Sequence, residues 1–371
     1  MTTQEQLAET SLHSAHVAAG ARMVPFAGWD MPIQYTSVID EHVAVRTSAG
    51  MFDVSHMGQL RVGGADAERA LDTVLSNDLA RIPDPGMAQY TLLTNDHGGI
   101  EDDLIAYRMD DGSFLLVVNA ANIDHDRAWI SHHIDASLDA VVVDESNAWS
   151  MIAVQGPLAM DVVNEVLGVS LQATPAFRHI RHASTVADMV FCTTGYTGER
   201  GCEILLRPED SVRVWSLLAK DDRIKLCGLA ARDTLRLEAC YPLHGNDITP
   251  TSSAIGAGLG WACPPGRSFP GAGLLDRERG EGPARRLVPL RMDGRGIPRG
   301  GCTVLDAAGE RVGVVSSGTM SPTLRSGIAL AWLDDSHAGH GTRVQIDVRG
   351  SAYDAHVVSR PFIHKTDEEQ S

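Results

Sequence analysis

The 371-residue chain lacks the cysteine pairs and long apolar runs that identify several large protein classes. Its six cysteines form no C-x-x-C pair and no Cys/His spacing suited to zinc, so we expect reduced thiols, no metal site and a cytoplasmic location. No run of about 18 apolar residues occurs, and no basic segment precedes an apolar run at the N-terminus. A membrane span and a secretion signal are therefore not expected.

Positive charge is also scarce. Lys and Arg total 31 against 48 Asp and Glu, which gives a formal net charge of −17. Such a chain repels polyanions, so nucleic acid is not an expected partner. Phosphate-binding loops of the form G-x-x-x-x-G-K-[ST] and nucleophile elbows of the form G-x-S-x-G are absent. The glycine cluster at 256–260 predicts a turn, because it has no strand before it and no helix after it.

The remaining composition is that of an ordinary globular protein with two or three domains. Apolar spacing and end signals predict helices at 37–49, 67–75, 209–220 and 229–239, with another opened by Pro157. Strands are expected at 58–62, 89–94, 104–109, 113–118, 151–155, 188–194 and 202–206. Because helices and strands alternate irregularly, the pattern favours an α+β fold over a doubly wound sheet.

A change of composition marks residues 264–300, which are rich in Gly, Pro and Arg. We expect a domain boundary here, with the seven arginines between 277 and 299 forming a solvated linker or a docking surface. Strands at short spacing follow at 311–318, 327–333, 342–348 and 352–358. They predict a small β barrel or roll.

Three consecutive carboxylates stand between a glycine turn and an apolar strand in NDHGGIEDDL, residues 95–104. On a strand, Asp102 and Asp103 point to opposite faces, so we expect one to be solvated and the other to face the core or a cleft. A cleft carboxylate can hold a developing cation or accept a proton. The alternative is an acidic turn that caps a hairpin.

The glycine-rich segment TGYTGERGCE, residues 194–203, ends in Glu203 at the start of a predicted strand. Glu203 could accept paired donors from a heteroaromatic ring, on which Tyr196 could stack, or it could form an ion pair with Arg232 or Arg236. The two arginines are four residues apart on one predicted helix and could bind an anion together. An ion pair of Arg232 with a neighbouring Asp on the helix surface is the commoner arrangement.

Taken in order, these segments resemble the T-protein of the glycine cleavage system, the tetrahydrofolate-dependent aminomethyltransferase family. The matching segments are collinear over nearly the whole chain, at 23–35, 41–60, 89–105, 118–122, 153–157, 194–203, 228–239, 245–250, 297–324 and 327–333. The resemblance implies a three-domain, clover-like α+β fold around a central folate channel. Two interwoven α+β domains would cover about residues 1–265, with an insert at about 54–140, and a C-terminal β barrel or roll would cover about 285–365.

The resemblance also implies a reaction. The aminomethyl group on the lipoyl arm of the H-protein loses ammonia as its carbon passes to N5 of tetrahydrofolate, which gives 5,10-methylenetetrahydrofolate. Tetrahydrofolate is then the acceptor substrate, and the lipoylated H-protein is the partner.

The family's site residues transfer by motif position. Asp103 matches the essential carboxylate, which positions folate and stabilises the cation, and Asp102 is the other candidate in that motif. Glu203 and Arg232 match folate contacts. Positions that line the channel are matched by Tyr90, Met57, Asn119 and Tyr196, and Lys365 matches a residue near the family's ending that could meet the folate tail.

Three residues depart from the family pattern. Thr194 replaces an Arg, Cys240 replaces a Gly and His244 replaces a Tyr. These departures keep open a second function, that of a paralogous tetrahydrofolate-dependent methyl or one-carbon transferase or demethylase that acts on a small methylated donor. Asp103 argues against a third, that of a folate-binding protein without activity.

Overall fold

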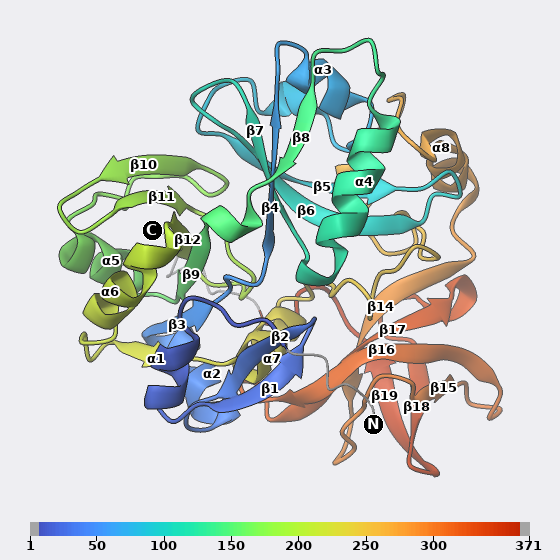
Figure 1. The fold of residues 1–371 in the computed structure, drawn as a ribbon. Helices are drawn as coiled ribbons and strands as arrows, with labels where there is room; N and C mark the ends of the chain where they lie inside the picture. The colour runs from blue at the N-terminus through green and yellow to red at the C-terminus, as the bar shows by residue number, and fades with distance from the viewer. Residues whose placement is uncertain (1–6, 364–371) are drawn as a thin grey trace, which may run out of the picture. The chain divides into compact units, whose positions relative to one another are not determined.

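A computed structural model describes residues 7–363. The chain divides into two compact units, the first made of residues up to Thr91 and 103–232, the second of residues 92–102 and 233 onward. Two strands and one helix continue from one unit into the other: β5 (Ala88–Thr94), β6 (Ile100–Arg108) and α7 (Leu229–Glu238). Figure 1 shows the elements under the labels used below.

A six-stranded sheet forms the core of the first unit. Its order is β10 (His179–Ala183), β11 (Asp188–Cys192), β12 (Gly201–Leu206), β9 (Ser150–Gln155), β3 (Ala49–Asp53) and β13 (Ile224–Leu226). All pairs are antiparallel except β13 with β3. The helices α5 (Ala159–Leu167) and α6 (Pro208–Leu218) pack against β9 (Figure 1). Every residue of β9 and β12 is buried. Glu203 and Gln155 therefore lie in the buried centre of the sheet.

A five-stranded sheet of order β5, β6, β7 (Phe114–Val118), β4 (Gly58–Gly63) and β8 (Val141–Asp144) carries the acidic motif on β6. The strands β6 and β7 are joined by a tight turn in which Gly112 has a φ of +82° and Asp111 accepts the Ser113 N–H. Helix α4 (Ile123–His133) packs on β4 and β8. Helix α3 (Ala67–Asp72) is shorter than predicted, because the β-branched Thr73 and Val74 follow it.

The first unit also holds the hairpin β1 (Arg22–Phe26) and β2 (Trp29–Gln34), with helices α1 (His13–Ala18) and α2 (Val38–Thr47). Helix α2 begins where the sequence predicts, because Ser37 Oγ accepts the Asp40 N–H as an N-cap.

The second unit contains a closed six-stranded barrel, which confirms the predicted C-terminal barrel. Its order is β14 (Arg285–Met292), β17 (Ser326–Asp334), β16 (Arg311–Ser321), β15 (Thr303–Leu305), β18 (Arg343–Val348) and β19 (Ser351–Val357). The barrel interior is filled by apolar residues that include Leu290, Val304, Ala331 and Ile346. Together with the sheets and helices of the first unit, it confirms the α+β class.

The expectation of a solvated linker is wrong for residues 272–292, because five of the seven arginines lie in a helix or a strand. Residues Ala272–Glu281 form helix α8 and Arg285–Met292 form the barrel strand β14. Arg279 donates to the carbonyl oxygens of Gly260 and Cys263, and Arg286 pairs with Asp335. Average composition is a poor guide here, because it does not reveal the helix and the strand that lie within the segment. No helix within residues 7–363 is long and apolar enough to cross a membrane.

Candidate functional site

Asp103 lies at the centre of a polar cluster built from three neighbouring strands. Tyr90 on β5 donates its phenol to Asp103 Oδ2 at 3.0 Å, and Asn119, directly after β7, donates Nδ2 to Asp103 Oδ1 at 3.1 Å. Asn119 also reaches the Asp103 carbonyl oxygen at 3.1 Å. All three residues are half-buried, so the carboxylate is fixed in direction and still accessible. The structure thus brings together three of the predicted site residues.

Asp102 has a different environment, as strand alternation predicts. Its carboxylate is fully buried, and His244 Nδ1 lies 3.8 Å from its Oδ1. His244 Nε2 is also 3.1 Å from the Ile100 carbonyl oxygen. Asp102 and His244 both belong to the second unit, whereas Asp103 belongs to the first. The expectation that one of the two carboxylates faces the core is met by Asp102, and Asp103 keeps the accessible position.

Glu203 is a buried carboxylate on β12, an inner strand of the six-stranded sheet. Thr194 donates its hydroxyl to Glu203 Oε2 at 2.5 Å, and the Tyr107 phenol lies 2.7 Å from the Thr194 hydroxyl. Burial raises the pKa of Glu203 above its usual value, and the Arg232 charge and the Thr194 hydrogen bond offset that rise only in part. Thr194 is therefore a direct partner of Glu203, a role that the sequence analysis missed.

Arg232 combines a buried charge with an unused donor. Its guanidinium carbon lies 4.9 Å from the centre of the Tyr196 ring, a cation–π contact. Burial lowers the pKa of Arg232, and Glu203 and Tyr196 oppose that shift. Nη1 is buried and has no hydrogen-bond partner among residues 7–363. An orphaned donor near a buried carboxylate fits a ligand that offers both an acceptor and N–H donors.

Arg236 does not share this site, so the hypothesis of a joint anion site on one helix face is wrong. Its guanidinium donates to Asp247 Oδ2 at 2.6 Å and to Ser317 Oγ at 2.8 Å, and it pairs with Asp233 at 2.7 Å. Helical spacing predicts that Arg232 and Arg236 share a face. The guanidinium of Arg236 is nevertheless held by the buried Asp247, so it is not available to a common anion site.

The loop that carries Tyr196 is held by Gln155, the last residue of β9. Gln155 Nε2 donates to the carbonyl oxygens of Thr194 (3.2 Å) and Cys202 (3.4 Å), and its Oε1 accepts the Thr197 hydroxyl at 3.0 Å. A Cβ at Gly195 would overlap the Gln155 amide. The glycine motif therefore serves close approach to Gln155 as well as turning.

Glu41 anchors the start of α7 and was not predicted. It is fully buried, accepts the backbone N–H groups of Tyr35 and Thr36 at 2.7 and 2.8 Å, and accepts the Gly228 N–H at 2.8 Å. Arg232 N–H bonds to the Gly228 carbonyl oxygen at 3.2 Å, so the anchor fixes the turn from which Arg232 projects. Nothing in the sequence distinguishes Glu41 from a surface residue of α2.

His56 lies in the turn between β3 and β4, next to the predicted Met57. It is 3% exposed, and its Nδ1 has no hydrogen-bond partner among the described residues. Burial lowers the pKa of His56 to about 4, with Arg232 acting in the same direction and Asp53 against it. Met57 itself is half-buried, and its carbonyl oxygen accepts from Gln59. The predicted Lys365 lies outside the described residues.

Cys240 shows how the backbone accommodates one departure from the family pattern. Its φ is +58°, in the left-handed region that glycine adopts freely, and its side chain packs with Leu237, Leu287 and Ile328. Burial raises the pKa of this thiol to about 12, so it stays protonated at neutral pH. Cys240 is thus a packing residue.

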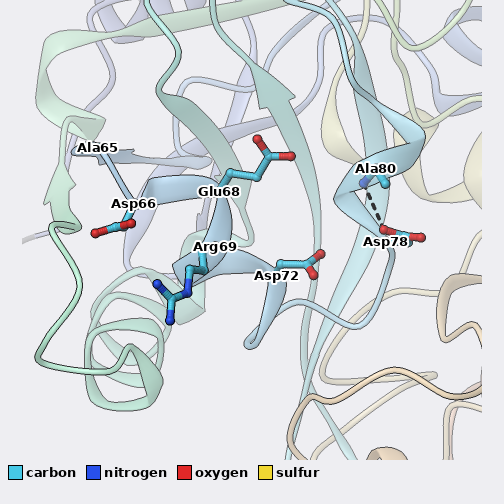
Figure 2. A pocket seen from close by; sticks show the side chains of 7 residues that line it. All are labelled: Ala65, Asp66, Glu68, Arg69, Asp72, Asp78 and Ala80. Atoms are coloured by element: carbon cyan, nitrogen blue, oxygen red, sulfur yellow. Dashed lines mark hydrogen bonds between the residues drawn. The ribbon is translucent and has the colours of Figure 1, made fainter.

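A surface hollow of about 370 Å³ lies elsewhere in the first unit and contains none of the predicted site residues (Figure 2). Three of its carboxylates already have structural partners. Glu68 binds Arg108, Asp66 accepts the Asp139 N–H, and Asp78 accepts the Ala80 N–H. We therefore do not assign the site to this hollow.

Comparisons with known proteins cover almost the whole chain. The family model for the GCVT N-terminal domain matches residues 12–266, and that for the glycine cleavage T-protein C-terminal barrel domain matches residues 285–364. An aminomethyltransferase of Anoxybacillus flavithermus is 41% identical over 366 residues, covering 97% of this chain and 100% of its own. One of Geobacillus kaustophilus is 42% identical over 366 residues, covering 97% and 99%. The crystal structure of the glycine cleavage system aminomethyltransferase T from Bartonella henselae superposes with a TM-score of 0.90 at 34% identity, covering 96% of this chain and 98% of that one.

Proposed function

The chain belongs to the glycine cleavage T-protein family of aminomethyltransferases, and from that premise we propose that it moves the one-carbon unit of an aminomethylated lipoyl H-protein to tetrahydrofolate. The donor S–CH₂–NH₂ group loses its carbon to N5 and N10 of tetrahydrofolate. The two protons released from those nitrogens pass to the thiolate sulfur and to the leaving ammonia. The products are 5,10-methylenetetrahydrofolate, ammonia and the dihydrolipoyl arm.

The observation that carries this proposal is the Asp103 cluster. The reaction passes through a cationic carbon, and a fixed carboxylate beside it lowers the energy of that charge. Tyr90 and Asn119 hold Asp103 from both neighbouring strands while leaving it half-buried and accessible. Asp103 thus acts through its charge and its position, without forming a covalent bond.

Glu203 and Arg232 are the proposed folate-binding pair. Glu203 accepts from pterin N–H groups through Oε1, which has no hydrogen-bond partner among the described residues, and Arg232 Nη1 donates to a pterin acceptor. Tyr196 holds the Arg232 guanidinium in place through a cation–π contact with its ring. Met57 and Lys365 complete the proposed folate contacts.

Two wider proposals follow from family membership. Residues 1–265, with the insert at about 54–140, form the folate-binding region, and residues 285–365 form the barrel domain. The reaction takes place in the cytoplasm, where the six unpaired cysteines stay reduced.

A transfer assay tests the function. The purified protein is mixed with tetrahydrofolate and aminomethylated lipoyl H-protein, and ammonia and 5,10-methylenetetrahydrofolate are followed together. We expect both products in equal amounts, and neither when tetrahydrofolate is omitted. Folate binding without either product, followed by turnover of a small methylated donor, would replace this function with that of a methyl or one-carbon transferase.

A further inference from the structure

A chain of two hydrogen bonds joins three buried side chains that come from separate parts of the first unit. The Tyr107 phenol lies 2.7 Å from the Thr194 hydroxyl, which lies 2.5 Å from Glu203 Oε2. Tyr107 is 1% exposed, Thr194 8% and Glu203 7%. Burying polar groups this deeply costs free energy unless each hydrogen bond is made. The two hydrogen bonds are therefore part of what stabilises this region of the fold.

The direction of the two bonds follows from the number of protons. A threonine hydroxyl has one proton, and Thr194 donates it to Glu203. The Thr194 oxygen then accepts from Tyr107, whose phenol stays protonated because burial raises its pKa well above the usual value. A hydroxyl that accepts one bond becomes a better donor in the next, so Tyr107 strengthens the bond that Thr194 makes to Glu203.

Tyr107 is also placed in a fixed relation to the proposed catalytic carboxylate. Asp103 and Tyr107 are four residues apart on β6 and lie on the same face of that strand, about 13 Å apart along it. Glu203 lies on β12, in the other sheet. The hydrogen-bond chain therefore ties the carboxylate proposed to bind folate to the strand that carries Asp103.

We propose that Tyr107 and Thr194 are positioning residues that favour the ionised form of Glu203 and leave Oε1, which has no hydrogen-bond partner among residues 7–363, available to a ligand. The consequence for folate rests on the proposed function, whereas the effect on Glu203 does not. Other charged or titratable groups that act on Glu203 are Arg232 from α7, Cys192 from β11 and the adjacent Cys202. Burial raises the pKa of both thiols, so they remain neutral, and Arg232 is the cation that assists Thr194.

The first test is the pH dependence of binding. The dissociation constant of 5-methyltetrahydrofolate is measured between about pH 5 and pH 9 for the unaltered protein, T194V, T194S and Y107F. Protonation of Glu203 removes an acceptor, so affinity falls as the pH falls through its pKa. T194V loses a hydrogen bond to a charged group. The pH at which affinity falls should therefore be higher by about one unit in this variant.

The two other variants separate the hydrogen-bond chain from simple packing. T194S retains the hydroxyl and should restore the profile of the unaltered protein. Y107F should raise the pH at which affinity falls by a smaller amount. It keeps the hydrogen bond from Thr194 to Glu203 and removes only the contribution of Tyr107 to its strength. The ligand's own titration is the same in every measurement, and melting temperatures identify any unfolded variant. A T194V profile that coincides with that of the unaltered protein would overturn the proposal.

A second measurement needs no ligand. The pKa of Glu203 is read from the ¹³C carboxyl resonance that disappears in E203Q, and it should be higher in T194V than in the unaltered protein. An equal pKa in the two proteins would overturn the role of Thr194 even if folate binds. If the unaltered protein fails to bind the folate while the T194V resonance shifts as expected, the proposed function fails and the positioning role stands.

Discussion

Replacing Asp103 by Asn removes the negative charge of the polar cluster on β6 while retaining its shape. The side chain can keep Oδ1 toward Asn119 Nδ2, where the present distance is 3.1 Å. Its new amide N–H₂ group then faces the Tyr90 oxygen, which lies 3.0 Å from Oδ2 and can accept as well as donate. Both contacts survive, so we expect a loss of about 1 kcal/mol or less in the free energy of unfolding.

The effect on the reaction should be far larger. Removing one group aimed at a developing charge costs about 3 to 4 kcal/mol in the barrier, which corresponds to a rate lower by roughly 10² to 10³. Folate affinity should change by less than about threefold, or roughly 0.7 kcal/mol, because Glu203 and Arg232 are proposed to supply most of the binding.

The assay is a single turnover, with aminomethylated H-protein and tetrahydrofolate in saturating amounts and the formation of 5,10-methylenetetrahydrofolate followed in time. Tyr90→Phe is the matched control, since it removes one hydrogen bond and retains the charge. We expect Tyr90→Phe to be slower by about tenfold at most, the value of one ordinary hydrogen bond. A D103N rate within tenfold of the unaltered protein would refute the role of the charge, and equal losses in D103N and Tyr90→Phe would assign the effect to geometry.

Three further outcomes can be measured. Glu203→Ala should weaken folate binding by about 1 to 3 kcal/mol, because pterin N–H donors lose their acceptor; an unchanged dissociation constant in calorimetry would exclude Glu203 from the site. His56 is protonated more readily in the unfolded chain, with a usual pKa of 6.5, than in the folded protein, where its pKa is about 4. Its contribution to stability is therefore complete above pH 6.5 and lost as the pH falls toward 4, about 3 kcal/mol in all. Denaturant titrations should show this pH dependence, and His56→Leu should lack it. Arg236→Met leaves Asp247 as a buried charge without its ion-pair partner and should cost about 3 to 5 kcal/mol, most of it recovered when Asp247→Asn is added; a single variant as stable as the unaltered protein would contradict this.

Local patterns in the sequence were sufficient to predict most helices and strands. They also predicted the different environments of the two carboxylates in the acidic motif. Strand alternation alone predicts that Asp102 and Asp103 have separate environments, and the structure gives them separate partners. Helical spacing failed at Arg232 and Arg236, because it says which residues share a face and not which buried partner each one meets. Asp247, eleven residues beyond Arg236 on the chain, decides that case.

The residues that shape the site from a distance could not be predicted from spacing. Glu41 is 187 residues from the Gly228 amide that it binds, and Gln155 is 39 residues from Thr194. Thr194 stands where the family pattern has an Arg, which does not reveal that its hydroxyl is the hydrogen-bond partner of Glu203. Such contacts depend on which distant segments the fold brings together. A pattern within one segment carries no information about that. The strand β14 in the arginine-rich segment could not be predicted for a related reason, since it pairs with β17, which lies about 40 residues further along the chain.

The central claim is that Glu203 and Arg232 bind a folate whose reacting nitrogens lie near Asp103. A crystal structure with 5-methyltetrahydrofolate tests it most directly. We predict the pterin ring within hydrogen-bond distance of Glu203 Oε1 and Arg232 Nη1, with N5 on the side of Asp103. Electron density for the ring at another place, with Glu203 and Arg232 making no contact to it, would contradict the account.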